Sequence, residues 1–241
     1  MSFQIFLTIY FLALAVEIFA NLAGAPLLQY FSKPSLMLIL LVYYILNTRK
    51  ADSSLKYLII LALVFAWLGD VLLLIDKHSK TFFVYGLSAF LIAHIFYIFY
   101  FWKIRRANKI EKFPNPLIFL AVAAYSLSLF GFIAPNVKNL LLPVGIYALV
   151  ISTMLAASLA AFDFGKQNFG KISVAGTLLF IVSDSILAIN RFAAPFELAP
   201  VFVMATYALA QLLIAEGSLR NLQNLSHSEH RSSLRFIYYS Q

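Results

Sequence analysis

The chain of 241 residues contains no cysteine, which excludes disulfide bonds, thiolate metal sites and cysteine nucleophiles. Charged residues are scarce as well, at 12% of the sequence, against about 25% in an ordinary soluble domain. No lysine or arginine precedes Lys33. The apolar N-terminus therefore lacks the basic start of a secretory signal peptide, and we expect it to be a retained membrane span.

Apolar residues dominate what remains. They make up 62% of the sequence, and the mean hydropathy is +0.88. They fall into blocks of about 20 residues, the length of helix that crosses a bilayer. A water-soluble globular protein is excluded, and an all-α integral membrane protein is predicted. The net charge of +8 is then expected to come from basic residues in cytoplasmic loops near anionic headgroups, and not to indicate binding of nucleic acid.

Polar breaks divide the chain into eight predicted spans that form one bundle. The spans cover residues 3–23, 34–47, 57–75, 81–102, 115–133, 139–162, 171–190 and 195–217. Seven spans are the main alternative, because the block at 34–47 is short. One transmembrane domain is thus predicted over 1–217, followed by a polar cytoplasmic tail at 218–241.

The basic residues predict an orientation. An even number of spans places both termini on one side of the membrane, and thirteen of the 18 lysines and arginines fall on that side. The positive-inside rule then places both termini in the cytoplasm. The absence of cysteine and the small size favour a bacterial inner membrane.

Four acidic residues lie inside apolar spans: Glu17, Asp70, Asp184 and Glu216. A charge at the bilayer centre costs about 2.5–3.5 kcal/mol on insertion scales, so such residues face the bundle interior and mark a functional site by default. Glu216 lies near a cytoplasmic end and is expected to reach water. Asp70 and Asp184 lie at matching depth, roughly 20 Å from the cytoplasmic boundary at 1.5 Å per residue. Whether they meet laterally is not written in the sequence.

The spacing of the two aspartates raises the question of a repeat. Asp70 and Asp184 are 114 residues apart, which hints at a duplication of four spans, a four-plus-four parallel repeat. His94 aligns with Gln211 only if the second copy has three extra loop residues. Identities around the aspartates are few, so a duplicated and an unduplicated origin both stay open.

Two carboxyls in a pocket poor in water predict acid–base chemistry, because one can remain protonated while the other is ionised. This pair is suited to acid-catalysed cleavage through an oxocarbenium-like state. A serine triad is disfavoured, since no G-x-S-x-G motif is present. A metal held by Glu17, Asp70, His94 and Asp184 is conceivable, but no metal-ligand spacing supports it, so neither a metal nor a cofactor is expected.

Short motifs in a fixed order run through most of the chain. They are Lys33-Pro34, Leu68-Gly69-Asp70, Gly86-Leu87 with His94 and Tyr97, Tyr147 with Met154, Ser183-Asp184-Ser185 with Leu187-Ala188, and Tyr207 with Gln211. By their order and spacing the chain resembles the YhhN-like family of membrane proteins, which includes lysoplasmalogenases. The resemblance implies an eight-helix bundle that hydrolyses the vinyl ether of a lysophospholipid from the bilayer, giving a fatty aldehyde and a glycerophospho-headgroup.

From the chemistry that the resemblance implies, we predict roles for the polar residues. One of Asp70 and Asp184 would protonate the vinyl ether while the other stabilises the cation or orients water. The expected substrate-binding residues are Glu17, Asn21, Lys33, His94, Tyr97, Tyr147, Ser183, Asn190, Arg191, Tyr207 and Gln211. Lys33 and Arg191 would hold the phosphate, although an ordinary role as interfacial anchors is equally consistent with their positions. Single polar residues such as Asn21 also serve interhelical hydrogen bonds, worth about 0.6 kcal/mol each.

Two other classes of function stay open. Intramembrane aspartates also couple protons to transport, so a transporter or lipid flippase is the main alternative. A purely structural membrane protein would have to explain two buried acids at one depth. Release of aldehyde by detergent-solubilised protein, without a membrane gradient, distinguishes an enzyme from a transporter. No oligomeric state is predicted.

Overall fold

The computed structural model describes residues 2–49, 51, 53–75, 80–111 and 113–239, and these contain helices and no strand. The helices are α1 (Phe3–Leu22), α2 (Pro26–Thr48), α3 (Leu55–Ile75), α4 (Lys80–Ala107), α5 (Pro116–Val137), α6 (Leu141–Ala160), α7 (Asn168–Ala188) and α8 (Ala199–Tyr239). A 3-10 turn at Lys138–Leu140 joins α5 to α6, and a π-helical turn at Ile189–Ala193 follows α7. Three basic residues that entered the charge asymmetry, Lys50, Lys77 and Lys112, lie outside the described residues.

Each of the eight predicted blocks falls on one of these helices, and the second block differs most in its bounds. Helix α2 begins at Pro26 rather than at residue 34, with Pro26 in the first turn, where its missing N–H costs nothing. Pro34 lies inside the helix. The hydroxyl of Ser35, next to this proline, donates a 2.5 Å hydrogen bond to the carbonyl of Phe31 in its own helix. A predicted short span is therefore a full-length helix.

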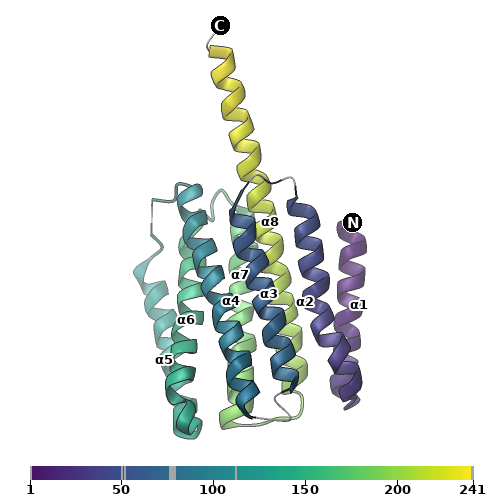
Figure 1. The fold of residues 1–241 in the computed structure, drawn as a ribbon. Coiled ribbons are helices and arrows are strands. Elements are labelled where there is room, and N and C mark those ends of the chain that lie inside the picture. The colour runs from purple at the N-terminus through teal and green to yellow at the C-terminus, as the bar shows by residue number, and fades with distance from the viewer. Residues whose placement is uncertain (1, 50, 52, 76–79, 112, 240–241) are drawn as a thin grey trace.

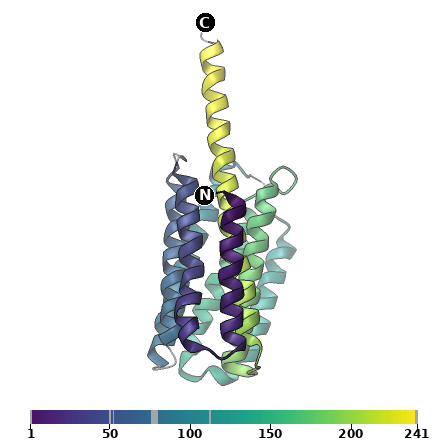
Figure 2. The same ribbon diagram turned by 90° about the vertical axis from the view of Figure 1, so that its right-hand side faces the viewer.

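Helix α8 continues past residue 217, where the polar tail was predicted to begin, and runs to Tyr239. Ser218, Leu219, Asn221 and Leu222 are buried among the other helices. These four residues lie on one side of the helix. That buried side, rather than the mean hydropathy of the segment, keeps the helix in the bundle. The yellow helix in Figures 1 and 2 accordingly extends beyond the ends of its neighbours.

Among the described residues, seven segments are long and apolar enough to cross a membrane, so the chain has the helices of an integral membrane protein. The predicted count of eight spans is not confirmed by this measure, because α5, the 3-10 turn and α6 form one apolar stretch, Pro116–Ala160. This stretch folds back on itself, as Figure 1 shows. The Ser126 and Ser152 hydroxyls lie 2.5 Å apart across the two arms, and Lys138 takes a positive φ of 53° at the bend.

The helices run up and down in one bundle, with the N-terminus and the emerging end of α8 at the same end (Figures 1 and 2). We call this the terminal end. Helices α7 and α8 pack closely because glycine lies at their contact: a β-carbon at Gly176 would lie 2.8 Å from the Ala210 carbonyl oxygen. Helix α5 lies at the edge, with only Ile133 and Val137 buried. The bundle is therefore tight around α8 and loose beside α5.

Candidate active site

Asp70 on α3 lies in a polar centre near the end of the bundle opposite the terminal end. The Tyr207 hydroxyl donates a 2.9 Å hydrogen bond to Asp70 Oδ2, and Lys33 Nζ lies 3.5 Å from Oδ1. The aspartate side chain is 2% exposed and the lysine 16%. The preceding residue, Gly69, leaves room for the Phe90 ring, which a β-carbon would approach to 2.6 Å. Three helices, α2, α3 and α8, thus meet at this carboxylate.

A second acid group adjoins this centre through α1 and α2. Buried Glu17 accepts a 2.8 Å hydrogen bond from Asn21 Nδ2 and a 2.5 Å hydrogen bond from the Ser32 hydroxyl. Ser32 precedes Lys33 in the chain, and Glu17 interacts electrostatically with Asp70. The predicted residues Glu17, Asn21, Lys33 and Asp70 are therefore brought together.

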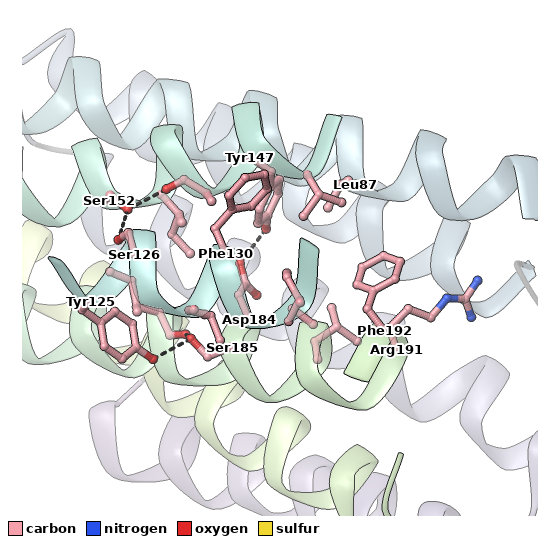
Figure 3. A pocket seen from close by; sticks show the side chains of 18 of the residues that line it. Leu87, Tyr125, Ser126, Phe130, Tyr147, Ser152, Asp184, Ser185, Arg191 and Phe192 are labelled. Atoms are coloured by element: carbon pink, nitrogen blue, oxygen red, sulfur yellow. Dashed lines mark hydrogen bonds between the residues drawn. The ribbon is translucent and has the colours of Figure 1, made fainter. Parts of the chain in front are cut away.

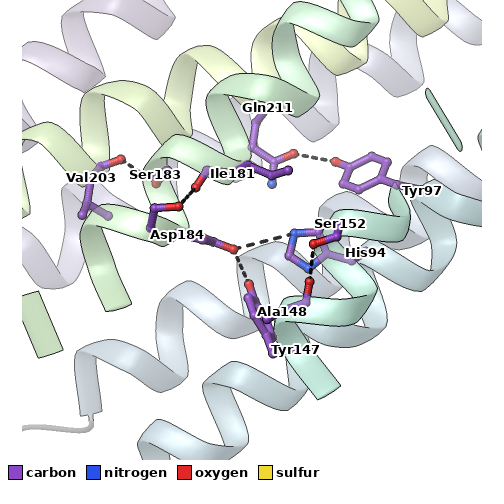
Figure 4. Close-up of polar contacts among 11 residues, drawn as sticks. His94, Tyr97, Tyr147, Ala148, Ser152, Ile181, Ser183, Asp184, Val203 and Gln211 are labelled. Carbon is purple, nitrogen blue, oxygen red and sulfur yellow. Dashed lines mark hydrogen bonds and ion pairs between the residues drawn. The ribbon is translucent and has the colours of Figure 1, made fainter. Parts of the chain in front are cut away.

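Asp184 on α7 has a different set of partners, shown in Figure 4. The Tyr147 hydroxyl donates a 2.6 Å hydrogen bond to Asp184 Oδ2, and His94 Nε2 lies 4.0 Å from the same oxygen. The imidazole ring is fully buried and edge-on to Phe180 and Tyr147, with ring centroids 4.7 and 5.3 Å away. Neither His94 nitrogen has a hydrogen-bond partner among the described residues.

Asp184 also lines a cavity between α4, α5, α6 and α7, seen in Figure 3. Counted with the open space at its mouth, the cavity holds about 690 Å³ that no atom fills. Its walls are mostly apolar, with Phe130, Leu87 and Phe192 among them. Polar groups enter at Asp184, at Arg191 and at a few hydroxyls, so the cavity suits an amphiphile.

The structure gives the two aspartates separate surroundings. Among the described residues, no hydrogen bond or ion pair joins Asp70 to Asp184, and Asp70 does not line the cavity. Aromatic rings connect the two centres: Tyr207 lies edge-on to Phe180, with centroids 5.5 Å apart, and Phe180 contacts His94. We call the rings of Phe180 and Tyr207 the aromatic layer. The two centres lie on either side of this layer and do not contact each other directly.

The other predicted site residues divide into those near the cavity and those with structural partners. Tyr97 donates a 2.5 Å hydrogen bond to Gln211 Oε1, which lies above His94 in Figure 4. Arg191 lies over the Phe83 ring at 4.5 Å, beside the cavity. Ser183 instead donates to the Val203 carbonyl (3.0 Å) and ties α7 to α8. Asn190 accepts from the Phe196 amide (3.0 Å) in the turn before α8. Neither Ser183 nor Asn190 lines the cavity.

Four hydroxyls that line the cavity were not predicted as site residues: those of Tyr125, Ser126, Ser152 and Ser185. The Tyr125 hydroxyl lies 2.8 Å from Ser185 Oγ, and Ser126 Oγ lies 2.5 Å from Ser152 Oγ, as Figure 3 shows. Their sequence signal is weak, because a serine in an apolar helix satisfies itself on a carbonyl of its own previous turn. Ser126 and Ser152 both do so here.

The acids and His94 do not gather around a common point. Within the described part of the chain, no three residues of the types His, Asp and Glu come close enough to hold a metal ion. Glu17 and Asp70 adjoin each other on one side of the aromatic layer, and His94 with Asp184 lie on the other. The arrangement therefore offers acid–base groups at two centres.

Comparison with known proteins identifies relatives. Human lysoplasmalogenase TMEM86B is 33% identical over 160 residues, covering 66% of this chain and 62% of the human protein. Rat TMEM86B is 31% identical over 140 residues, covering 58% and 53%. Lysoplasmalogenase of Mycobacterium bovis is 27% identical over 219 residues, covering 90% and 79%. The chain thus spans less than two thirds of the length of the two mammalian relatives. No solved structure matches it.

The family assignment rests on a longer match, which covers the helices that carry both centres. Residues 28–218 match the YhhN family. The matched segment contains Lys33, Asp70, His94, Tyr147 and Asp184, and it ends at the buried part of α8. Because this segment covers well over half of the sequence, the chain belongs to the YhhN family.

Proposed function

We propose that this protein is a lysoplasmalogenase, which hydrolyses the vinyl ether bond of a 1-alkenyl lysophospholipid to a fatty aldehyde and a glycerophospho-headgroup. The observation that carries the proposal is the carboxyl of Asp184 in the wall of a mostly apolar cavity. Relatives that cover most of this chain bear the name lysoplasmalogenase. A membrane enzyme whose substrate is an amphiphile needs such a combination of an apolar cleft and a few convergent polar groups.

The cavity offers a separate place for each part of the substrate. The long alkenyl chain would lie among the apolar side chains of α5 and α6, reached sideways from the bilayer beside the loosely packed α5. The phosphate would lie near Arg191, whose side chain is exposed at the end of α7. A guanidinium binds phosphate oxygens by paired, charge-assisted hydrogen bonds. The vinyl ether, between chain and headgroup, would then lie at Asp184.

The chemistry follows from this placement. Asp184 is assigned as the acid, because a general acid must reach the reacting atom and Asp184 is the aspartate that lines the cavity. Its proton goes to the β-carbon of the vinyl ether, and the electron pair of the C=C bond forms the new C–H bond, leaving an oxocarbenium ion. Water adds to the cationic carbon and returns a proton to the carboxylate. The resulting hemiacetal breaks its C–O bond to the glycerol oxygen, which gives the aldehyde and a free hydroxyl.

Neighbouring side chains would hold the groups in place during these steps. Tyr147, by its 2.6 Å hydrogen bond, fixes the orientation of the Asp184 carboxyl. His94, 4.0 Å away, is placed to orient the attacking water. Asp70 and Lys33 supply a fixed ion pair on the other side of the aromatic layer. There Asp70 is assigned as the ionised partner, which orients Tyr207 and, through it, the Phe180 ring.

Internal symmetry supports the proposal of eight membrane crossings in a four-plus-four parallel repeat. Asp184 lies 114 residues after Asp70, and Tyr147 lies 114 residues after Lys33. Each aspartate therefore contacts the equivalent position on the helix before its own, α2 for Asp70 and α6 for Asp184. The second partners, Tyr207 and His94, are 113 residues apart and come from the fourth helix of the opposite half. Eight crossings of a bacterial cell membrane, with both termini on its cytoplasmic side, accord with the distribution of lysine and arginine.

Aldehyde release by purified protein in detergent tests this function. Wild-type protein is expected to release aldehyde from 1-alkenyl lysophosphatidylethanolamine or lysophosphatidylcholine, and none from the 1-acyl analogues. Asp184→Asn should lose at least 100-fold in turnover, because a general acid contributes about 10²–10⁴-fold. Asp70→Asn should also lose turnover, while Asp163→Asn, in the loop before α7, is the matched control.

Two results would contradict the proposal. Unchanged substrate in detergent, combined with movement of the lipid in sealed vesicles, would identify a transporter. Near-normal turnover by Asp184→Asn would remove that carboxyl from the mechanism.

A further inference from the structure

Behind the cavity, fully buried polar side chains line the facing sides of two helices. On α4 they recur at every third residue, and on α8 they occupy one face. We call the set the polar file: His94, Tyr97 and Tyr100 on α4, and Gln211, Ser218 and Asn221 on α8, each with no exposed surface. From Gln211 to Asn221 the file extends roughly 15 Å along the helix axis, at 1.5 Å per residue. It ends within one turn of exposed Gln223 at the terminal end.

Hydrogen bonds and close approaches link the members of the polar file. Its inner end is the 2.5 Å hydrogen bond from Tyr97 to Gln211, which lies beside His94 in Figure 4. Further toward the terminal end, the Tyr44 hydroxyl of α2 lies 2.8 Å from Ser218 Oγ. Tyr44 also interacts electrostatically with Tyr97 and Tyr100. Polar groups therefore follow one another from the cavity side to the terminal end.

The polar file contains more hydrogen-bonding atoms than it satisfies. Both nitrogens of His94, Nε2 of Gln211, the Tyr100 hydroxyl and both amide atoms of Asn221 are buried without a hydrogen-bond partner among the described residues. The Tyr100 hydroxyl interacts with Ser218 and Asn221, but without the full geometry of a hydrogen bond. Buried polar groups in proteins are almost always paired, and where protein atoms do not pair them, internal water does. Six such atoms in one line call for several molecules of water.

We infer that the polar file holds a chain of water molecules, which connects the terminal end of the bundle to His94 at the back of the cavity and supplies the water consumed in hydrolysis. This supply role rests on the proposed function. Each turnover uses one molecule of water, and a bound lysophospholipid would close the cavity on the side of Arg191 with its headgroup and on the side of α5 with its chain. The polar file is the route that stays open behind the substrate.

Hydroxyl-radical footprinting tests whether the file is hydrated. A short X-ray pulse on detergent-solubilised, substrate-free protein generates radicals from bound water, and mass spectrometry locates the oxidised side chains. Tyr100 is expected to be oxidised at least fivefold faster than Phe101, its equally buried neighbour, whose ring packs against Phe162. Asn221→Leu should reduce oxidation of Tyr100 to the level of Phe101, and Asn221→Ser should restore it. Equal protection of Tyr100 and Phe101 in the wild type would show a dry file and overturn the inference.

Kinetics test the supply role. Asn221→Leu is expected to lower kcat for aldehyde release at least fivefold with KM for the lysophospholipid within twofold, because it leaves the substrate's contacts intact. Asn221→Ser should recover most of kcat. Asn47→Leu is the matched control, since the Asn47 amide bonds only the carbonyl of its own helix in the described contacts. An Asn221→Leu kcat equal to that of the control would overturn the supply role. If the wild type released no aldehyde while Tyr100 was still oxidised, the proposed function would fail and the hydrated file would stand.

Discussion

Replacing Lys33 by methionine tests the ion pair with Asp70. Methionine keeps an unbranched apolar stem and removes the ammonium that lies 3.5 Å from Asp70 Oδ1. At this distance and an effective dielectric constant of about 20, two unit charges attract by about 5 kcal/mol. Desolvation offsets much of this attraction, but removing one partner leaves a carboxylate that is 2% exposed without its cation. Loss of one partner of a buried pair typically costs about 3–5 kcal/mol.

We expect the melting temperature of Lys33→Met to fall by roughly 10 °C, since about 2–4 °C corresponds to each kcal/mol at this size. The chain has two tryptophans and no cysteine, so intrinsic fluorescence during heating in detergent is the suitable readout. Lys33→Met combined with Asp70→Asn should recover most of the loss, because the double variant buries no unpaired charge. Lys171→Met, at an exposed position on α7, is the matched control.

The double variant decides the interpretation. Equal melting temperatures for Lys33→Met and Lys33→Met/Asp70→Asn would show that the two side chains are not coupled, and the ion pair would be refuted. A Lys33→Met protein with unchanged melting temperature and a raised KM would instead favour the earlier prediction that Lys33 holds the substrate phosphate.

Three further predictions follow from single contacts. Tyr147→Phe removes one hydrogen bond to Asp184 and should lower kcat about tenfold, the equivalent of about 1.4 kcal/mol, with KM within twofold in the aldehyde assay; an unchanged kcat would contradict a positioning role. Gly217→Ala should lower the melting temperature, because its β-carbon would lie 2.2 Å from Ser173 Oγ and overpacking costs about 1–3 kcal/mol; Gly131→Ala, where nothing lies within 4 Å, should leave it unchanged. Arg191→Gln should raise KM for the lysophospholipid but not for an alkenyl glycerol without phosphate, and an equal rise for both would exclude phosphate binding.

Local sequence signals predicted the helices well. Each apolar block of about 20 residues falls on a helix, because a helix that faces lipid must carry apolar side chains, although only seven segments of the described residues count as separate spans. The same signals failed to predict the ends of two helices, α2 and α8, where residues of low hydropathy are nevertheless packed in the bundle. Helix α2 begins at Pro26, eight residues before the predicted start of the second span. Helix α8 remains buried at Asn221, since one buried face is enough to hold a helix in the bundle.

The sequence identified candidate site residues but not how they group in space. Asp70 and Asp184 were identified because a buried charge is too costly to keep without a use, and the structure places both inside the bundle. Their separate partners depend on which helix faces which, and hydropathy carries no information on that. Tyr125 and the other unpredicted hydroxyls of the cavity lie on faces that the sequence cannot distinguish from lipid-facing ones.

The amino-acid sequence by itself determined three features of this protein: that it is a membrane protein, which segments are helical, and which side chains are too polar to face lipid. Each of these depends on the free energy of transferring the side chains of one helix from water to lipid. Only the tertiary structure decided that Lys33 pairs with Asp70, that Tyr147 and His94 surround Asp184, and that an apolar cavity opens beside α5. In a bilayer the hydrophobic effect does not draw helices together, so their lateral order comes from close packing and from hydrogen bonds between side chains far apart in the chain.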